Sequence, residues 1–303
     1  MKNKNLIRSD QHFLDFPLWA LDDRLNKLKQ FTVNTDQGQY ILTCGNKPPD
    51  ATDSLFLYSF MKLAQQENKK TITITNRNKI LKMCGMIRCK QSYNRLWESL
   101  ERWKEVSAKF DGCYYDIDKN KHVKMLFGII DWAKYDEDAK ELTFKFNDVF
   151  YKAMKEAKLY RLIDLDYYKM LKRPVSRRLY ELMKRKLDNQ LTWSCEALKL
   201  AEKLTLNLKY PSQIIQKLNP AINEINKNTD IEIELDTRKT EEKRTIFTFK
   251  KIEKKTDKEL KDLKKAAQGC WKSTKGNCAS FRTNLTQEQM SPICEYCPGR
   301  KKS

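Results

Sequence analysis

Cationic and amide side chains are concentrated in one short stretch of the chain, between residues 88 and 95. Lysine and arginine bind DNA phosphates, and arginine and the amide side chains also form paired hydrogen bonds with base edges in the major groove. These residue types therefore favour recognition of duplex DNA. The candidate DNA-binding residues in and just before this stretch are Arg77, Arg88, Lys90, Gln91, Ser92, Asn94 and Arg95.

Four cysteines near the C-terminal end form a second group of candidate functional residues, with the spacing of a metal site. Their spacing is Cys-x7-Cys-x15-Cys-x2-Cys, and four thiolates are the soft ligands that tetrahedral zinc prefers. We expect a structural zinc site, because metal binding would supply the folding free energy of so small a segment. An iron–sulfur cluster is the alternative, favoured by the proline after the last cysteine, and unliganded thiols are a third. The expected ligands are Cys270, Cys278, Cys294 and Cys297.

The residues around the first group predict a helix-turn-helix that would present it. Residues 71–75 alternate β-branched side chains and favour a short strand, and Asn76 can cap a helix that runs to about Cys84. Gly85 permits a tight connection to a second helix. An α-hairpin with a solvated polar face explains this stretch equally well. The side chains spaced for burial on the second helix are Tyr93, Leu96, Trp97, Leu100 and Trp103.

The following residues favour a winged helix. Residues 106–117 and 123–132 predict two strands joined by a polar turn, with Lys119 and Lys121 at the tip of the resulting wing, and residues 141–146 predict another strand. Residues 53–63 before the first strand predict a helix capped by Thr52 or Asp53. Helix, strand, helix, helix and hairpin is the element order of a winged helix.

The second half of the chain repeats this plan. A helix over about residues 175–187, with its arginines and lysines outward, precedes a short strand and a second pair of helices. Residues 231–235 and 245–249 alternate as two strands around a basic turn. Two such units in one basic chain favour a tandem DNA-binding protein over a solvated α-hairpin.

We therefore predict an α+β protein with two tandem winged-helix domains and a small C-terminal four-cysteine metal-binding segment. The expected divisions are an N-terminal arm with short strands (1–49), the first winged-helix domain (50–158), the second (159–252), a charged linker or helix (253–268) and the four-cysteine segment (269–303). In the arm, aromatic residues before and after Pro17 favour an edge strand whose rings pack onto the first domain.

The composition agrees with a nucleic-acid partner. The chain has 303 residues, a formal net charge of +20 and 40% hydrophobic residues, so it can bury two ordinary cores and should associate with a polyanion. No apolar run approaches the roughly 20 residues of a membrane span, and the N-terminus lacks the apolar core of a signal peptide. We therefore expect a cytoplasmic protein with no membrane partner.

The sequence offers no catalytic constellation, so no catalytic residue is predicted. A metal-dependent nicking site needs neighbouring histidines, and the two histidines, His12 and His122, are far apart in the sequence. A nucleotide-driven motor would need a Gly-x4-Gly-Lys-Ser/Thr loop, which is absent from the sequence. A non-enzymatic DNA-binding role is therefore expected.

Several motifs resemble the plasmid replication initiator protein A family. They are Phe-Pro-Leu-Trp at 16–19, Tyr-Asn-Arg-Leu-Trp-Glu-Ser-Leu at 93–100, the segment 161–180, and Leu-Asn-Pro-Ala-Ile-Asn-Glu-Ile-Asn at 218–226. The resemblance extends over roughly residues 13–252 and excludes the cysteine segment. It implies two winged helices that bind repeated sites in double-stranded origin DNA and promote opening of an adjacent AT-rich region.

The resemblance also implies partners and further site residues. Host replication proteins, such as the replicative helicase or the host initiator, are the expected protein partners, and both a monomer and a homodimer remain open. A winged-helix transcriptional regulator or autorepressor without an initiation role is the alternative function. Besides the residues of the first helix-turn-helix, the resemblance points to Ser212, Gln213, Gln216, Lys217, Arg238 and Lys239.

Binding that neutralises roughly 6 to 10 phosphates predicts strong salt dependence. The association constant for DNA should fall by on the order of 10³ to 10⁵ between low and moderate salt, because each neutralised phosphate releases counterions. Titrations on DNA from beside the protein's own gene and on scrambled duplex of equal length measure this. Saturable preference for tandem repeats supports an initiator, whereas equal binding to both leaves only a basic DNA-associating protein.

Overall fold

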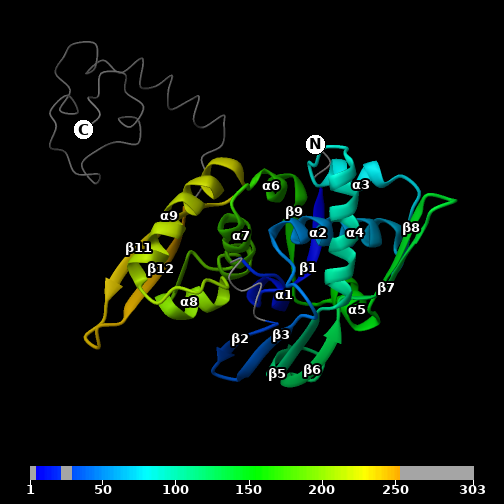
Figure 1. Ribbon diagram of the computed structural model, residues 1–303. Helices are drawn as coiled ribbons and strands as arrows, with labels where there is room; N and C mark the ends of the chain where they lie inside the picture. Colours follow the sequence, from blue (N-terminus) through cyan, green and yellow to red (C-terminus); the bar gives the residue numbers. More distant parts are fainter. Residues whose placement is uncertain (1–4, 22–28, 253–303) are drawn as a thin grey trace, which may run out of the picture. The chain divides into compact units, whose positions relative to one another are not determined.

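Asn76 and Gly85 set the first helix-turn-helix as the sequence predicts. The structure, a computed structural model, describes residues 5–21 and 29–252 (Figure 1). The Asn76 side chain accepts a hydrogen bond of 3.0 Å from the Asn78 amide, and Gly85 has a φ of 68° in the turn. The elements of this unit are α2 (Ala51–Glu67), β4 (Thr71–Ile74), α3 (Arg77–Met83), α4 (Lys90–Lys104), β7 (Ile130–Asp136) and β8 (Glu141–Phe146).

The first wing is formed by a different hairpin from the predicted one. Strands β4, β8 and β7 make one antiparallel sheet in the order β4-β8-β7, so the wing tip is the turn at residues 137–140. The predicted wing strands are β5 (Ser107–Asp116) and β6 (Lys121–Gly128), which pair with β2 (Gln30–Thr35) and β3 (Gly38–Thr43) in the order β2-β3-β5-β6. The placement of Lys119 and Lys121 on the first wing is therefore wrong.

Pairing with β3 explains why β5 leaves the wing. The two strands are in register from Gln39 opposite Asp111 to Thr43 opposite Ser107. This pairing buries Tyr40 and Phe110 side by side, with ring centroids 4.9 Å apart, and Phe16 packs on both rings. The apolar face of the β5–β6 hairpin is thus covered by the N-terminal arm, and its edge is paired with β3.

The N-terminal arm contains a short helix where an edge strand was predicted. Asp10 accepts a hydrogen bond of 2.8 Å from the His12 amide and caps α1 (Gln11–Asp15), so the strand β1 (Leu6–Asp10) ends before the aromatic residues. The prediction that Phe13 and Phe16 anchor the arm on the first domain is confirmed by their packing on Phe150 and Phe110. Trp19 is also buried, but its indole N–H donates to Glu181, outside the first domain. Strand β1 pairs with β9 (Tyr160–Asp164), which follows α5 (Asp148–Glu156).

The second unit has the predicted order of elements. Its three strands form one antiparallel sheet in the order β10-β12-β11, and α9 is continuous through Pro220. None of the helices in the described part of the chain is long and apolar enough to cross a membrane. The elements are α6 (Leu165–Met170), α7 (Pro174–Lys186), β10 (Thr192–Glu196), α8 (Ala197–Lys203), α9 (Pro211–Asn228), β11 (Glu232–Lys239) and β12 (Thr245–Ile252).

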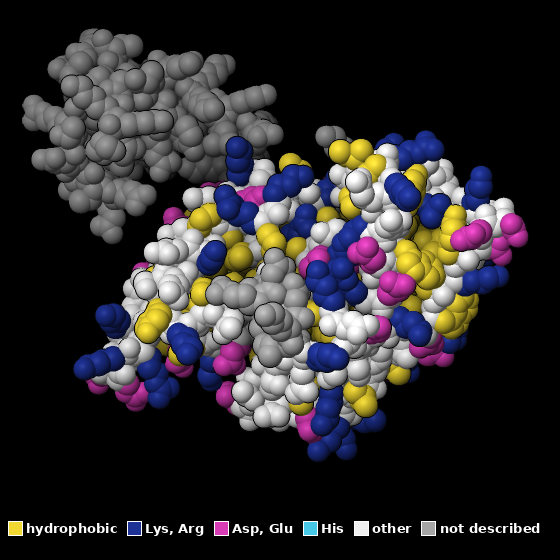
Figure 2. Space-filling model, viewed as in Figure 1, with side chains coloured by type: hydrophobic (Ala, Val, Ile, Leu, Met, Phe, Trp, Pro, Cys, Tyr) yellow, Lys and Arg dark blue, Asp and Glu magenta, His cyan; other side chains and the backbone are white. Residues whose placement is uncertain are grey.

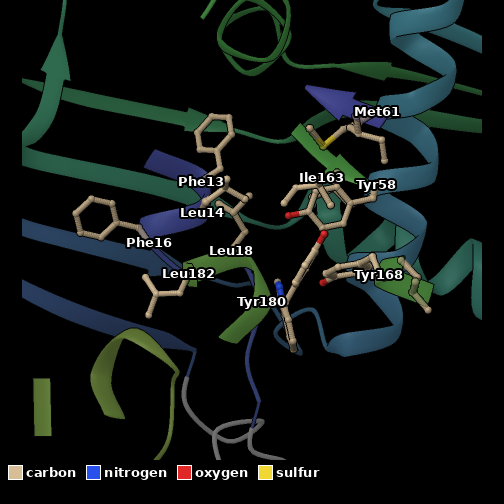
Figure 3. Close-up of a cluster of buried hydrophobic side chains, with 14 of the residues drawn as sticks. Phe13, Leu14, Phe16, Leu18, Tyr58, Met61, Ile163, Tyr168, Tyr180 and Leu182 are labelled. Atoms are coloured by element: carbon tan, nitrogen blue, oxygen red, sulfur yellow. The ribbon is translucent and has the colours of Figure 1, made fainter. Parts of the chain in front are cut away.

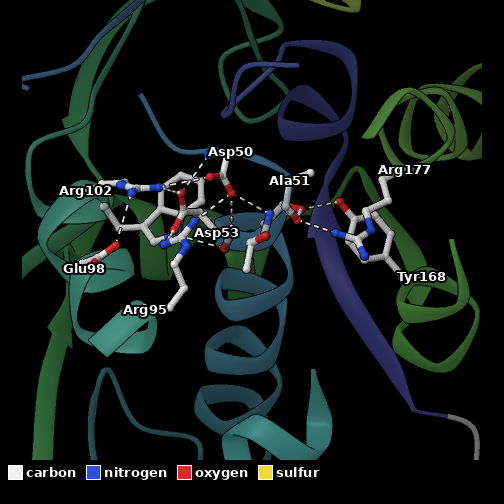
Figure 4. A network of polar contacts seen from close by, with 11 residues as sticks. Asp50, Ala51, Asp53, Arg95, Glu98, Arg102, Tyr168 and Arg177 are labelled. Carbon is white, nitrogen blue, oxygen red and sulfur yellow. Dashed lines mark hydrogen bonds and ion pairs between the residues drawn. The ribbon is translucent and has the colours of Figure 1, made fainter. Parts of the chain in front are cut away.

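Two arginines of α7 that were expected to point outward are buried. Arg178 is fully buried and donates hydrogen bonds of 2.9 Å and 3.0 Å to the carbonyl oxygens of Leu14 and Asp15. Its guanidinium also pairs with Glu181 at 2.8 Å. Arg177 donates to the Ala51 carbonyl oxygen at 2.6 Å (Figure 4). The prediction that these two arginines point outward is therefore wrong. They point inward because backbone carbonyl oxygens of the N-terminal arm and of the start of α2 face this side of α7.

Glu181 collects hydrogen bonds from three regions of the chain. Its carboxylate accepts from the hydroxyl of Tyr168 at 2.7 Å, the hydroxyl of Tyr58 at 3.2 Å and the indole N–H of Trp19 at 3.2 Å. Figure 3 shows Tyr58 and Tyr168 in the same buried cluster as Leu18 and Ile163. We call Arg178, Glu181 and these three donors the buried polar brace, since it joins the arm, α2, α6 and α7.

Arg178→Ala should lower the free energy of unfolding by about 3–5 kcal/mol, because it leaves the buried Glu181 carboxylate without its cation. Urea unfolding at neutral pH measures this. Glu241→Ala, in the exposed turn between β11 and β12, is the control and should change the value by less than about 0.5 kcal/mol. Equal changes in the two variants would contradict the role of the brace.

Candidate nucleic-acid interface

The start of α4 and the turn before it expose four of the predicted DNA-binding side chains. Arg88, Lys90, Gln91 and Asn94 are all exposed, and Asn94 makes no hydrogen bond or ion pair within the described residues. Figure 2 shows lysine and arginine side chains gathered over this end of α3 and α4 and again at the tip of the β11–β12 hairpin. An exposed helix end with this composition can enter a major groove and contact both phosphates and bases.

Two other predicted residues of α4 face the protein interior. Ser92 is buried, and its Oγ lies 3.3 Å from Cys89 Sγ. Arg95 forms ion pairs of 2.6 Å with Asp53 and 2.8 Å with Asp50. The sequence placed both residues among the DNA contacts, whereas the structure gives them partners within the protein. Their contribution to DNA binding remains a prediction.

The Arg95 ion pairs fix α4 against the start of α2. Asp50, rather than Thr52 or Asp53, is the helix cap, and Asp53 completes a capping box with it (Figure 4). Arg102, two turns further along the same face of α4, also forms an ion pair with Asp53 at 2.8 Å. Burial raises the pKa of Asp50, but Arg95 and backbone hydrogen bonds outweigh that effect and lower it below its ordinary value. The exposed end of α4 is therefore held in one orientation.

Arg77 connects α3 to both α4 and the wing. Its guanidinium lies 4.7 Å from the centroid of the Tyr93 ring and 4.3 Å from that of Tyr135 on β7. The Tyr93 hydroxyl donates a hydrogen bond to Asn78 on α3. Beside them, a groove of about 560 Å³ between α4 and the wing is lined by Asn94 and by these aromatic rings. Arg77 is half-buried, so this stacking accounts for its position.

Helix α9 of the second unit is held through polar contacts on its inner face. Glu224 accepts hydrogen bonds from the backbone amides of Lys172 at 2.7 Å and Arg173 at 3.2 Å, and from Ser176 Oγ at 2.5 Å. It thereby caps α7, whose own N-cap residue makes no side-chain hydrogen bond. The Asn226 side chain bonds both the amide and the carbonyl of Ile233 at 2.9 Å, which ties α9 to β11.

The outer face of α9 is lined by amide side chains. Ser212, Gln213, Gln216 and Lys217 are all exposed, as the resemblance implies. Asn219 and Asn223 are exposed on the same helix and line a groove of about 600 Å³ between α9 and β11. These two were not among the predicted DNA-binding residues, although their spacing of three and seven residues after Gln216 places all three amides on one face.

The hairpin tips present the remaining predicted cations. Arg238 and Lys239 are exposed at the end of β11, where the second wing turns. Lys119 and Lys121 are also exposed, but at the β5–β6 turn, and Lys119 pairs with Asp116 at 3.6 Å. Arg238 and Lys239 can therefore accompany α9 on one duplex, whereas Lys119 and Lys121 belong to a separate hairpin.

A metal site is not formed by the part of the chain that the structure describes. Within it, no group of three or more histidine, cysteine or acidic side chains is arranged to hold a metal ion. The four cysteines predicted to bind zinc, Cys270, Cys278, Cys294 and Cys297, lie outside the described residues. The five other cysteines are free, and three of them are buried.

Comparisons with known proteins agree with this architecture. Residues 10–223 match the family model of Replication initiator protein A, and a search of curated proteins gives no match. The crystal structure of the Pi initiator protein in complex with iteron DNA is similar, with a TM-score of 0.55 and 17% identity over 84% of this chain and 100% of that one. Domains 2 and 3 of RctB give 0.55 and 12% over 80% and 98%. These likenesses show the fold of tandem winged-helix initiator domains.

Arg95→Ala should lower the stability of the fold, whereas Asn94→Ala should weaken DNA binding. Loss of the Arg95 ion pairs should lower the free energy of unfolding by about 1.5–3 kcal/mol, whereas Asn94→Ala should stay within about 0.5 kcal/mol and weaken binding to cognate DNA. Urea unfolding and anisotropy titrations measure the two effects.

The stability part of this prediction depends on pH. The lowered pKa of Asp50 means that its pairing stabilises the folded state above the unfolded-state pKa. The difference between wild type and Arg95→Ala should therefore shrink as the pH falls below about 4. A difference that is constant down to pH 2 would contradict the assigned ion pairs.

Proposed function

The chain belongs to the Replication initiator protein A family, and from this we propose that it is a plasmid replication initiator that binds repeated sites in origin DNA through α4 and α9. One observation carries the proposal. Each unit holds the second helix of its helix-turn-helix by polar contacts on the inner face, and the outer face exposes amides and cations that have no partner among the described residues. The Pi initiator, which shares the fold, is described in complex with iteron DNA.

On each of the two helices, different side chains would contact the bases and the phosphates. Asn94 on α4 and Gln216 on α9 are amides, which read adenine in the major groove, while Lys90 and Lys217 supply affinity that is independent of sequence. Arg238 and Lys239 would hold the backbone beside α9. Bound to repeats, the protein would promote opening of an adjacent AT-rich region and recruit host replication proteins.

Gln216→Ala should weaken binding to the origin repeats by about tenfold, because a good paired contact discriminates by about 1–3 kcal/mol, and should leave binding to scrambled DNA unchanged. Lys217→Ala should instead weaken binding to both and reduce the salt slope by about 1. Anisotropy titrations with labelled duplexes measure these values.

Lys124→Ala is the matched control. This exposed lysine lies on β6, whose sheet β2-β3-β5-β6 is separate from the sheets of both winged helices. A loss of binding equal to that of Lys217→Ala would contradict the proposed interface. Origin-dependent replication of a reporter plasmid in cells then tests initiation. Normal repeat binding without replication would support a transcriptional regulator instead.

We also propose that the four C-terminal cysteines hold one structural zinc ion, on the sequence pattern described above. The purified protein should contain about one zinc per chain, and Cys294→Ser with Cys297→Ser should abolish it. Elemental analysis measures the metal, with Cys195→Ser as the control. Bound iron with visible absorption would instead indicate an iron–sulfur cluster. A metal-free protein would contradict both the zinc site and the cluster.

A further inference from the structure

A third pocket lies apart from the two grooves beside the recognition helices. It is formed where α1, the β2–β3 turn, the β5–β6 hairpin, the end of α7 and α8 meet, and it has a volume of about 450 Å³. This volume lies within the usual range for small-ligand sites, roughly 300–1,000 Å³. Neither the predicted DNA-binding residues nor the buried polar brace lines it.

Positive charge dominates the lining of this pocket. Its cations are Arg185, Lys186, Lys199 and Lys203, whereas Asp15 and Asp36 are the carboxylates among its lining residues. The Asp15 carboxylate forms ion pairs with both Lys186, at 2.8 Å, and Lys203, at 2.9 Å. Asp36 is highly exposed and lies 3.8 Å from Lys199. The cations therefore exceed the carboxylates by two, four against two.

Among the lining cations, Arg185 is the one without a partner in the described part of the chain. Its Nε is buried and has no hydrogen-bond partner in the described part of the chain, and no ion pair there reaches its guanidinium. Burial lowers the pKa of Arg185, with Asp15 opposing this effect and Arg161 adding to it. A buried donor without an acceptor destabilises the protein unless water or a ligand supplies one.

The neighbouring lysine is in a similar environment. Burial is the largest effect on Lys186 and lowers its pKa, and the charges of Lys203 and Arg185 lower it further, although Asp15 opposes them. An anion placed among these side chains would relieve the repulsion between them. A group with several acceptor oxygens and more than one negative charge matches both the charge excess and the free donor at Arg185.

We propose that this pocket binds a small anionic ligand that carries a di- or triphosphate group, such as a nucleotide. Arg185 would donate to the phosphate oxygens, and Lys199, at the exposed rim, would neutralise a second charge. Lys186 and Lys203 would remain on Asp15 and contribute through their positive field. The polar turn of residues 34–37 and the side chains of Tyr115 and His122 complete the lining available to the rest of the ligand.

Calorimetric titration of the full chain with pyrophosphate and with ADP, at fixed ionic strength, tests the proposal. Arg185→Gln should raise the dissociation constant by about tenfold or more, because a hydrogen bond to a charged group is lost. Lys199→Gln should raise it by a smaller factor and, as an exposed substitution, should not affect folding. Lys124→Gln removes one exposed charge outside the pocket and should leave the constant within about twofold.

Three outcomes would overturn the proposal. They are the absence of pyrophosphate and ADP binding by the wild-type chain at millimolar concentration, equal weakening in Lys199→Gln and Lys124→Gln, and binding that vanishes in parallel with added salt in all variants. A short duplex distinguishes the other source of phosphate. If Arg185→Gln and Lys199→Gln weaken duplex binding while pyrophosphate and ADP do not bind, the pocket contacts the DNA backbone and the small-ligand proposal is wrong.

Discussion

The pairing of Arg178 with Glu181 is the constraint on which the described fold depends. Two opposite charges buried together are costly to remove from water, and they are tolerated only when their remaining donors and acceptors are satisfied. Here the arginine bonds the arm and the end of α8, and the carboxylate is bonded by Trp19, Tyr58 and Tyr168. These partners come from both winged-helix units, so the pair is satisfied only when arm, α2 and α7 are assembled together.

In each unit, polar contacts within the protein lie on the inner face of a helix, and exposed amides and cations lie on the outer face. Asp53 holds α4 through Arg95 and Arg102, and Glu224 holds α9 by capping α7. In both cases a carboxylate on an inner helix face is matched to groups of another helix. The outer faces carry the amides and cations. The positions of α4 and α9 are thus determined by contacts within the protein, away from their exposed faces.

Much of the fold could be predicted from local sequence, and the failures have a common physical cause. Asn76, Gly85 and the spaced apolar residues of α4 act within a few residues, so that helix-turn-helix was predicted correctly. The wing was assigned to β5–β6 because both successive hairpins alternate in the same way, and only pairing with the distant β3 and β4 separates them. Arg95 and Arg178 were expected outside for the same reason, since sequence shows a charge but not the distant carboxylate that pairs with it. The DNA contacts themselves remain predictions.

The unpartnered outer face of α9 has an evolutionary consequence. Gln216 and Asn223 make no hydrogen bond within the described residues, so a substitution there changes what the helix contacts without disturbing the folded chain. Glu224, one position further along, accepts hydrogen bonds from three donors at and just before the start of α7 and cannot change alone. Distant, unshared positions contribute independently. The preferred DNA sequence can therefore diverge one residue at a time among descendants of this protein, while the residues that hold the helix must change together or not at all.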